Sequence, residues 1–335
     1  MNIIQLRNLK IYMGIVLLKI IVFLFLTLNL FSKDLVEIYR NQGLSSVQEL
    51  LDEKLKDQNY WMEYLENKDI KYGYYETKKY VLVTHKNQSE IALYKNENYE
   101  LELISRNSVI VGENEGDKFF EGDKKTPIGV YDLTEKKTNL DQFYGPFALV
   151  TSYPNTFDKT LGKDGSGIWI HGMPLNEERE KFTRGCIALD NPQLEELEKS
   201  IDLENTVLLT ASGILQEATK EEVSKILAMI YDWKDAWKYS NIYEYLNFYS
   251  ENFKRFDGME LQEFKRYKKR IFSKKEKKKI KLYNIDISPY PNSLDKRIYK
   301  VIMDEDYISP AVKFFGKKEL YVEFIDGEVK ILTEG

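Results

Sequence analysis

Short apolar runs rich in β-branched and aromatic residues follow one another from Lys79 to Thr210, separated by turns rich in Gly, Asn and Asp. Such runs are too short for helices and are typical of strands, so they restrict this part of the chain to a mostly β domain. One helix is expected within it, with Asn191 as N-cap and Pro192 as first helical residue. The predicted strands cover residues 80–84, 91–94, 99–104, 109–111, 128–133, 147–151, 168–170, 187–189 and 207–210.

The stretch of residues 168–189 contains the only cysteine, Cys186, and one of the two histidines, His171. One apolar run ends at His171 and the next begins directly after Cys186, so both side chains are expected at strand ends. A thiol with its reference pKa of about 8.5 is only slightly ionised at neutral pH and needs a base to act as a nucleophile. We expect His171 to be that base, reaching Cys186 across neighbouring strands.

The residues around the cysteine favour the same chemistry. Arg184 adds positive charge beside a thiolate, and the backbone N–H groups around Gly185 and Cys186 are candidates for an oxyanion hole. The alternative is structural, because a single cysteine is more often a small buried hydrophobe and a single histidine a packed side chain. Their occurrence together, each next to a glycine, argues for a site.

This stretch resembles the active-site signature of the YkuD-type L,D-transpeptidase family, which reads H-G, a gap, then [ST]-x-G-C and an apolar residue. One position departs, because many members carry a second histidine where this chain has Arg184. Residues 125–131 resemble the family's T-P-x-G-x-[FY] element, and residues 144–147 resemble the segment before its next strand. The resemblance covers about residues 79–211. The matching signature positions are His171, Gly172, Thr183, Gly185, Cys186 and Ile187.

The resemblance implies a β-sandwich-like catalytic domain, which we place at residues 77–212, acting on peptidoglycan stem peptides. Cys186 would be the nucleophile and His171 the base, with the carbonyl of Gly172 orienting the imidazole. Arg184, Gly185 and Thr183 would bind substrate or the oxyanion. Neither a cofactor nor a metal is expected, and His85, far from every motif, is interpreted as structural.

The first residues have the features of an export signal. Basic residues precede or punctuate an apolar run over residues 20–31, and no acidic residue occurs before Asp34. Residues 1–33 are therefore expected to be a signal peptide or a membrane anchor, with Met13 as an alternative translation start. A small Ser32 suits cleavage, whereas Leu30 suits it poorly. We expect export to a periplasm.

Residues 34–76 are expected to form a small helical N-terminal domain. Leu35, Ile38 and Tyr39, followed by apolar residues from Val47 to Leu55, recur at helical spacing, and Gly43 separates two helices. The aromatic residues that follow, among them Trp61 and four tyrosines, are interpreted as a packing surface for the catalytic domain. A subunit interface in a homodimer is the alternative.

The C-terminal residues 219–335 change character from helical to strand-like. A helical pattern runs from Val223 to Trp237, and strand-like runs follow at residues 279–288, 297–304 and 320–325, an α+β arrangement. The aromatic elements resemble the NTF2-like domain of the cell-shape-determining peptidoglycan L,D-carboxypeptidases. Trp233, Trp237 and Tyr245 line a ligand pocket or form ordinary aromatic core.

Residues 265–281 contain a dense basic run, interrupted by the single acid Glu276. We interpret it as a solvated face, with docking on anionic lipid or wall polymer as the alternative. The net charge of −5 argues against nucleic-acid binding by the whole chain.

The domain order favours a peptidoglycan L,D-carboxypeptidase that removes the terminal D-Ala from tetrapeptide stems through a cysteine thioester. Two alternatives stay open at this point. A second stem's amine as acceptor would give an L,D-transpeptidase that forms 3-3 cross-links, and a merely buried cysteine would leave a non-catalytic cell-wall-binding module.

Overall fold

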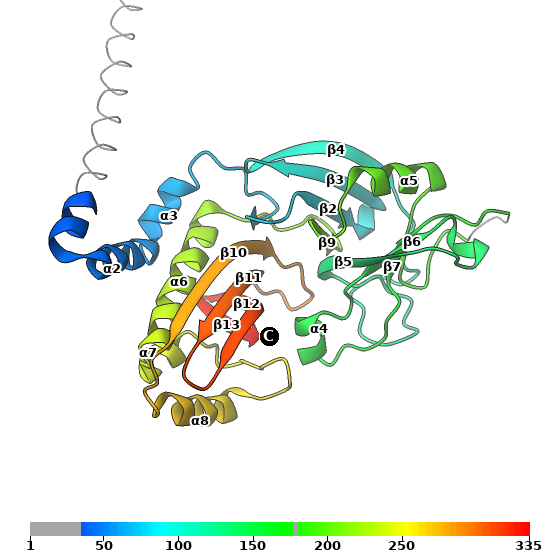
Figure 1. Ribbon diagram of the computed structural model, residues 1–335. Helices are drawn as coiled ribbons and strands as arrows, with labels where there is room; N and C mark the ends of the chain where they lie inside the picture. Colours follow the sequence, from blue (N-terminus) through cyan, green and yellow to red (C-terminus); the bar gives the residue numbers. More distant parts are fainter. Residues whose placement is uncertain (1–34, 177–179) are drawn as a thin grey trace, which may run out of the picture. The chain divides into compact units, whose positions relative to one another are not determined.

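The structure is a computed structural model that describes residues 35–176 and 180–335 (Figure 1). The chain divides into two compact units, Met1–Asp57 and Gln58–Gly335. In the described part of the first unit, residues 35–42 are helical and Gly43, at φ 85°, separates them from α2 (Leu44–Leu55). The predicted signal peptide or anchor at residues 1–33 lies outside the described residues.

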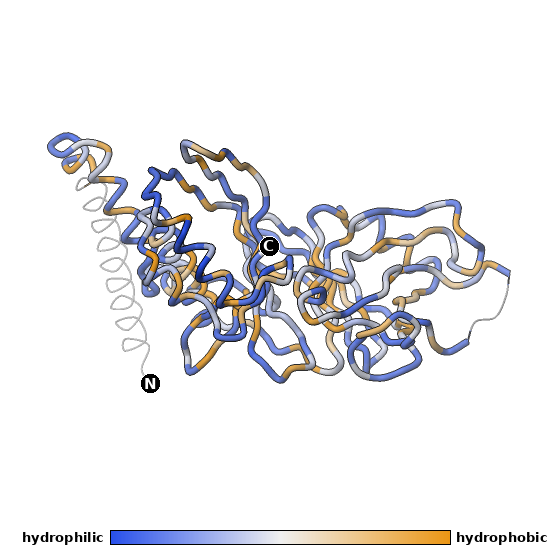
Figure 2. Tube along the Cα trace, turned by 90° about the horizontal axis from the view of Figure 1, so that it is seen from below, coloured by the Kyte–Doolittle hydropathy of each residue, from blue (hydrophilic) through white to orange (hydrophobic). Residues whose placement is uncertain are grey.

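No helix within residues 35–176 and 180–335 is long and apolar enough to cross a membrane. Figure 2 shows hydrophobic and hydrophilic stretches alternating along the described chain rather than one extended hydrophobic run.

The second unit contains a mixed eight-stranded sheet, which confirms the mostly β class predicted for the catalytic domain. Its strand order is β4-β3-β2-β9-β5-β6-β7-β8, parallel at β2/β9 and β7/β8 and antiparallel elsewhere. An isolated bridge joins Ile110, just after β4, to Ala188 in β8, so the sheet curls until its first and last strands approach. The strands are β2 (Tyr80–His85), β3 (Glu90–Glu97), β4 (Glu100–Ser108), β5 (Gly129–Lys137), β6 (Ala148–Thr151), β7 (Trp169–His171), β8 (Ile187–Ala188) and β9 (Thr206–Ala211).

The prediction of a strand at residues 109–111 was wrong, because Ile110 forms only that bridge. Helix α5 (Asn191–Ser200) packs Leu194 and Leu197 into the core on one face of the sheet. Its N-cap is Asp190 rather than Asn191. The short helices of this domain are η1 (Lys86–Gln88), η2 (Gln142–Tyr144) and α4 (Thr156–Thr160).

The C-terminal domain is an antiparallel sheet covered by helices, which confirms the predicted α+β class. Its strand order is β1-β10-β11-β12-β13, with α6 (Lys220–Lys238), α7 (Ile242–Asn247) and α8 (Leu261–Phe272) beside it (Figure 1). The strands are β1 (Tyr74–Tyr75), β10 (Lys279–Pro289), β11 (Ile298–Ile308), β12 (Lys313–Ile325) and β13 (Glu328–Glu334).

The segment expected to be a helical lead-in contributes to this C-terminal domain. Its helix α3 (Gln58–Tyr64) packs on α6, where the rings of Trp61 and Tyr231 stack with centroids 5.8 Å apart. The helical prediction extended to residue 76, whereas β1 pairs with β10. The aromatic residues of this segment pack on both domains, because Trp61 stacks on Tyr231 whereas the rings of Tyr72 and Tyr74 contact Tyr94 and Tyr99 of the catalytic domain. The predicted packing against the catalytic domain is therefore confirmed for the tyrosines.

One hydrophobic cluster joins the two sheets. Val81, Val130 and Leu209, on the second face of the catalytic sheet, pack with Tyr290 and Tyr321 of the C-terminal domain. Burial of this apolar surface holds the sheet that carries the candidate site against the C-terminal domain.

Candidate active site

The two predicted catalytic side chains come from neighbouring strands. β7 and β8 are parallel, His171 at the end of β7 lies opposite Ala188, and Cys186 directly precedes β8. Both side chains line one pocket of about 590 Å³, so the structure brings them together as the sequence predicted. The other lining residues are Asp141, Phe143, Tyr144, Glu180, Phe182, Thr183 and Arg184.

His171 is held by a backbone hydrogen bond. The ring is 1% exposed, and its Nδ1 lies 2.7 Å from the carbonyl oxygen of Gly172. Because a carbonyl only accepts, this bond requires a proton on Nδ1, which in a neutral ring leaves the lone pair on Nε2. The ring of Tyr144 packs edge-on against the imidazole at 5.1 Å between centroids. The imidazole is thus oriented by an uncharged group, with Gly172 in the place that the resemblance implied.

The loop after His171 is fixed by Asn191, a residue whose role the sequence analysis missed. Its Oδ1 accepts a hydrogen bond from Met173 N at 2.8 Å. A Cβ on Gly172 would lie 2.1 Å from the same oxygen, so only glycine fits there without a shift. An Asn-Pro pair at a helix start is also typical of helix capping. The residue spacing alone does not distinguish a capping role of Asn191 from its hydrogen bond to the loop.

Thr183 and Gly185 brace the cysteine turn. The Thr183 hydroxyl accepts from Gly185 N at 3.0 Å and donates to the carbonyl of Cys186 at 2.7 Å. Thr183 is 2% exposed. Thr183 also lines the pocket, so its predicted role in binding substrate or the oxyanion, and that of Gly185, stay predictions.

Gly185 is required by its surroundings. Its φ is +130°, and a Cβ there would lie 2.8 Å from the backbone oxygen of Lys125. Lys125 opens the T-P-x-G element noted in the sequence, whose Thr126 accepts from Gly112 N at 2.9 Å. The two motifs thus meet behind the cysteine, with backbone packed against backbone.

Cys186 and Arg184 lie at the accessible side of the pocket. Cys186 is half-buried, with Sγ 3.5 Å from the carbonyl of Gly167. Arg184 is exposed and shares the rim with the acidic residues Asp141 and Glu180. The pocket therefore offers a thiol and an imidazole at its wall and a cation at its mouth.

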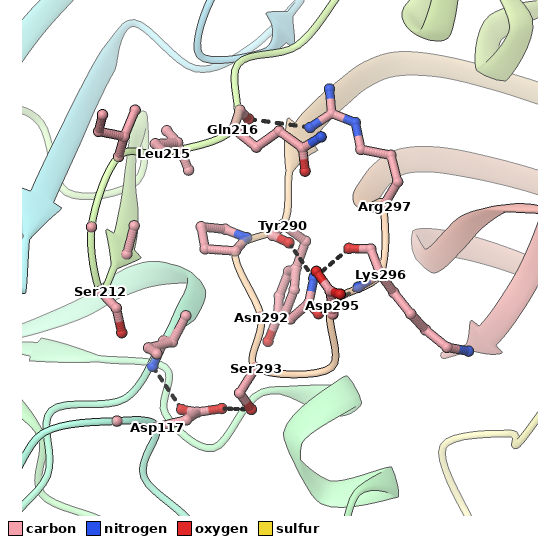
Figure 3. A pocket seen from close by; sticks show the side chains of 16 residues that line it. Asp117, Ser212, Leu215, Gln216, Tyr290, Asn292, Ser293, Asp295, Lys296 and Arg297 are labelled. Carbon is pink, nitrogen blue, oxygen red and sulfur yellow. Dashed lines mark hydrogen bonds between the residues drawn. The ribbon is translucent and has the colours of Figure 1, made fainter.

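A second hollow of about 460 Å³ lies between the two domains (Figure 3). The carboxylate of Asp117 there accepts from Ile128 N at 2.9 Å and from the Ser293 hydroxyl at 3.2 Å, and it pairs with Lys163 at 2.7 Å. Arg297 donates to the carbonyl of Gln216 across the same hollow. These groups join the domains, and we assign no chemistry to them.

Other predicted residues prove structural. His85 Nδ1 lies 2.9 Å from the carbonyl oxygen of Gly213, a packing role. Trp233 and Tyr245 have no exposed surface, so they belong to aromatic core, while Trp237 is half-buried and stacks on Tyr307 at 5.2 Å. Among the described residues, no three His, Cys, Asp or Glu side chains cluster in a way that would hold a metal ion.

Comparisons with known proteins agree with this architecture. Residues 78–209 match the L,D-transpeptidase catalytic domain, and residues 225–335 match the Cds6 C-terminal NTF2-like domain. The helical cell shape determining protein Pgp2 of Campylobacter jejuni is 40% identical, with a TM-score of 0.79 over 84% of this chain and 99% of that one. Bd1075 of Bdellovibrio bacteriovorus is 26% identical, with a TM-score of 0.63 over 80% of this chain and 96% of that one. No curated protein matches the chain.

Fold, site and matched domains together define an L,D-transpeptidase-type catalytic domain fused to an NTF2-like domain. The chain belongs to the YkuD family of peptidoglycan enzymes, carries a Cds6-like C-terminal domain and is similar to Pgp2. Enzymes of peptidoglycan work outside the cytoplasm, which agrees with the export predicted from the first residues.

Proposed function

We propose that the protein is a periplasmic L,D-carboxypeptidase that removes the terminal D-Ala from peptidoglycan tetrapeptide stems and so influences cell shape. The observation that carries the proposal is the shared pocket, in which Cys186 and a backbone-oriented His171 line one wall and Arg184 the mouth. The likeness to Pgp2, a protein named for determining helical cell shape, supports the biological role.

The reaction begins with Cys186. His171 takes the thiol proton at Nε2, and the sulfur attacks the carbonyl carbon of the bond between meso-diaminopimelate and D-Ala. The carbon–nitrogen bond breaks, and the D-Ala amine leaves with the proton from His171. A thioester joins the shortened stem to Cys186.

Water resolves the thioester. It gives a proton to His171 as its oxygen bonds to the carbonyl carbon, the carbon–sulfur bond breaks, and the thiol regains its proton. The Gly172 carbonyl keeps the imidazole in one tautomer through both steps, in the manner of the third member of a triad but without a charge.

Arg184 is proposed to bind the D-Ala carboxylate. A guanidinium presents two parallel N–H groups to a carboxylate, and this one is exposed at the pocket mouth. A stem with a free carboxyl end would therefore be preferred over one already joined to another stem.

The test is a product analysis on purified disaccharide tetrapeptide, read by mass spectrometry. The chain from residue 34 onwards should release D-Ala and tripeptide, and Cys186→Ala should release neither although it folds normally. Lys159→Gln, an exposed change away from the pocket, serves as the control and should behave as the unaltered chain.

Two other results would replace the proposal. Cysteine-dependent cross-linked dimers would make the protein an L,D-transpeptidase, because the acceptor would then be an amine. Absence of any cysteine-dependent product, with tight binding to peptidoglycan, would make the domain a wall-binding module.

A further inference from the structure

A basic face on the C-terminal domain lacks the carboxylate partners found elsewhere in the protein. Along α8 it comprises Lys265, Arg266, Lys269 and Arg270, and beyond the helix Lys274, Lys275, Lys277, Lys279 and Lys281. None of these nine side chains forms an ion pair with a carboxylate in the part of the chain that the structure describes, and all but the half-buried Lys265 are exposed.

The buried lysines of the same run behave differently. Lys268 lies 3.8 Å from Glu334, and Lys278 donates to the hydroxyl of Ser240. The run therefore separates into side chains that hold the fold together and side chains that leave their charge in solvent. Glu276 is the one acid within the run, so the run carries a large excess of positive charge.

An apolar tip adjoins this face. The register pairs Lys279 with Ile308 and Ile308 with Lys313, which places the start of β10 beside the turn between β11 and β12. In Figure 1 α8 and this turn lie at the same lower end of the C-terminal domain. Residues 310–315 are all exposed, and Val312, Phe314 and Phe315 expose 52%, 44% and 63% of their surface.

Strand pairing places the apolar tip on both faces of the sheet. Lys281 lies opposite Asp306, and Asp306 lies opposite Phe315, so Lys281 and Phe315 share one face. Phe314 lies opposite Tyr307 on the other face, where Tyr307 stacks on Trp237 of α6. Asp306 accepts from the Tyr283 hydroxyl at 3.2 Å. Ser240, bonded to Lys278, brings Tyr239, which is 65% exposed, to the same end.

We propose that this face docks the C-terminal domain on an anionic phospholipid bilayer. The unpaired lysines and arginines lie over the headgroups, and the tip of Val312, Phe314 and Phe315 enters the interfacial layer, with Tyr239 at its edge. Docking of this kind would hold the catalytic domain close to a membrane independently of the first residues of the chain.

The combination of charge with exposed apolar side chains selects lipid over an anionic polymer. A soluble polyanion binds through charge alone, because the phenylalanine side chains stay in water when it is bound and contribute no binding free energy. Both the cations and the apolar side chains favour binding to a bilayer, because the headgroups attract the cations and the acyl boundary removes the aromatic rings from water.

The test is co-sedimentation with vesicles of phosphatidylglycerol and phosphatidylcholine, against vesicles of phosphatidylcholine alone. Residues 35–335 are used, because the unit Gln58–Gly335 contains both sheets and both hydrophobic clusters and the omitted apolar run would bind lipid by itself. Binding is expected to the anionic vesicles only and to weaken with salt.

Matched variants separate charge from apolar insertion. Lys274→Gln, Lys275→Gln and Lys277→Gln together should weaken binding roughly 100-fold, at about fivefold per side chain. The same change at Lys79, Lys159 and Lys199, which are also exposed, should have little effect.

Loss of the apolar tip should weaken binding as well. Val312→Ser with Phe315→Ser should reduce it roughly tenfold or more, whereas Phe120→Ser with Ile214→Ser, which are at least as exposed, should not. The proposal is overturned if anionic vesicles do not bind the protein, or if either face variant binds them as the unaltered chain does. Face-dependent binding to purified peptidoglycan sacculi without binding to vesicles would make the wall the partner instead.

Discussion

The catalytic pocket and the interior of the C-terminal domain both bury polar groups, but they compensate them in opposite ways. In the pocket, His171 and Thr183 are satisfied by backbone carbonyls and an amide. In the C-terminal interior, Glu334 is 6% exposed and lies 3.0 Å from Lys318 and 3.8 Å from Lys268, with the Tyr249 hydroxyl donating to it at 2.6 Å.

Because the buried polar groups have backbone partners in the pocket and charged partners in the C-terminal domain, the two regions should differ in how pH and the loss of a partner affect them. Burial lowers the pKa of Lys268 to about 8, although Glu334 opposes the shift. Burial alone would raise the pKa of Glu334, but Lys318 and Lys268 bring it down to about 2. Backbone partners do not titrate, so substitutions at the pocket should change catalysis, whereas substitutions in the charged interior should change stability.

Glu334→Gln should produce the largest stability loss. It leaves the buried Lys268 and the half-buried Lys318 without the counter-charge of Glu334, which costs about 3–5 kcal/mol of the free energy of unfolding. Urea unfolding measures the loss, and Glu328→Gln on the same strand, whose partner Lys330 lies 2.7 Å away at the surface, is the control. Equal stability of the two variants would show that the interior charges are not coupled to folding.

The dependence of stability on acidic pH should report on the carboxylate of Glu334. Its pKa is about 2 in the folded chain against an ordinary 4.5, so its contribution is complete above about pH 4.5 and is lost as the pH falls towards 2. The full contribution is about 3 kcal/mol. The free energy of unfolding of the unaltered chain should therefore fall more steeply over this interval than that of Glu334→Gln. Parallel curves would place the stabilising titration on other acids.

The sequence predicted those parts of the fold that depend on local pattern. Strands of the catalytic domain were found because apolar runs alternate with turn residues, and the position of Cys186 beside His171 followed from strand ends. Helix α8 was missed because its apolar residues, Leu261, Phe264 and Phe272, are interspersed among basic ones that read as a solvated run. β13 (Glu328–Glu334), in the same domain, was also missed.

Contacts across the sheet could not be predicted. The bond from Met173 to Asn191 joins residues that follow β7 and β8, and their approach depends on the pairing of these two strands. The motif identified Thr183 and Gly185 as site residues, but it did not predict the hydrogen bonds within the cysteine turn, which are not visible in one sequence.

Thr183→Val tests the expectation that a substitution at the catalytic pocket changes catalysis. Valine keeps the shape but removes both turn hydrogen bonds, so the Cys186 backbone loses its brace at a cost of about 1–3 kcal/mol. We expect kcat to fall with little change in KM, because the nucleophile and not the bound substrate is displaced. Thr183→Ser retains the hydroxyl and should restore kcat. If serine and valine variants are equally impaired, the methyl packing of Thr183 matters rather than its bonds.

Arg184→Lys should produce the smallest change, and one confined to substrate binding. Lysine keeps the charge at the pocket mouth but loses the two parallel N–H groups, so KM should rise about five- to tenfold, or ~1 kcal/mol, with kcat preserved. A tetrapeptide with an amidated D-Ala end lacks the carboxylate and provides the second arm of a double-mutant cycle. The unaltered enzyme should lose affinity for the amidated stem, while the lysine variant should lose much less on amidation, since its paired contact is already absent. Additive losses would mean that Arg184 does not contact the carboxylate, and the cation at the mouth would then act only through the general attraction of an anionic stem.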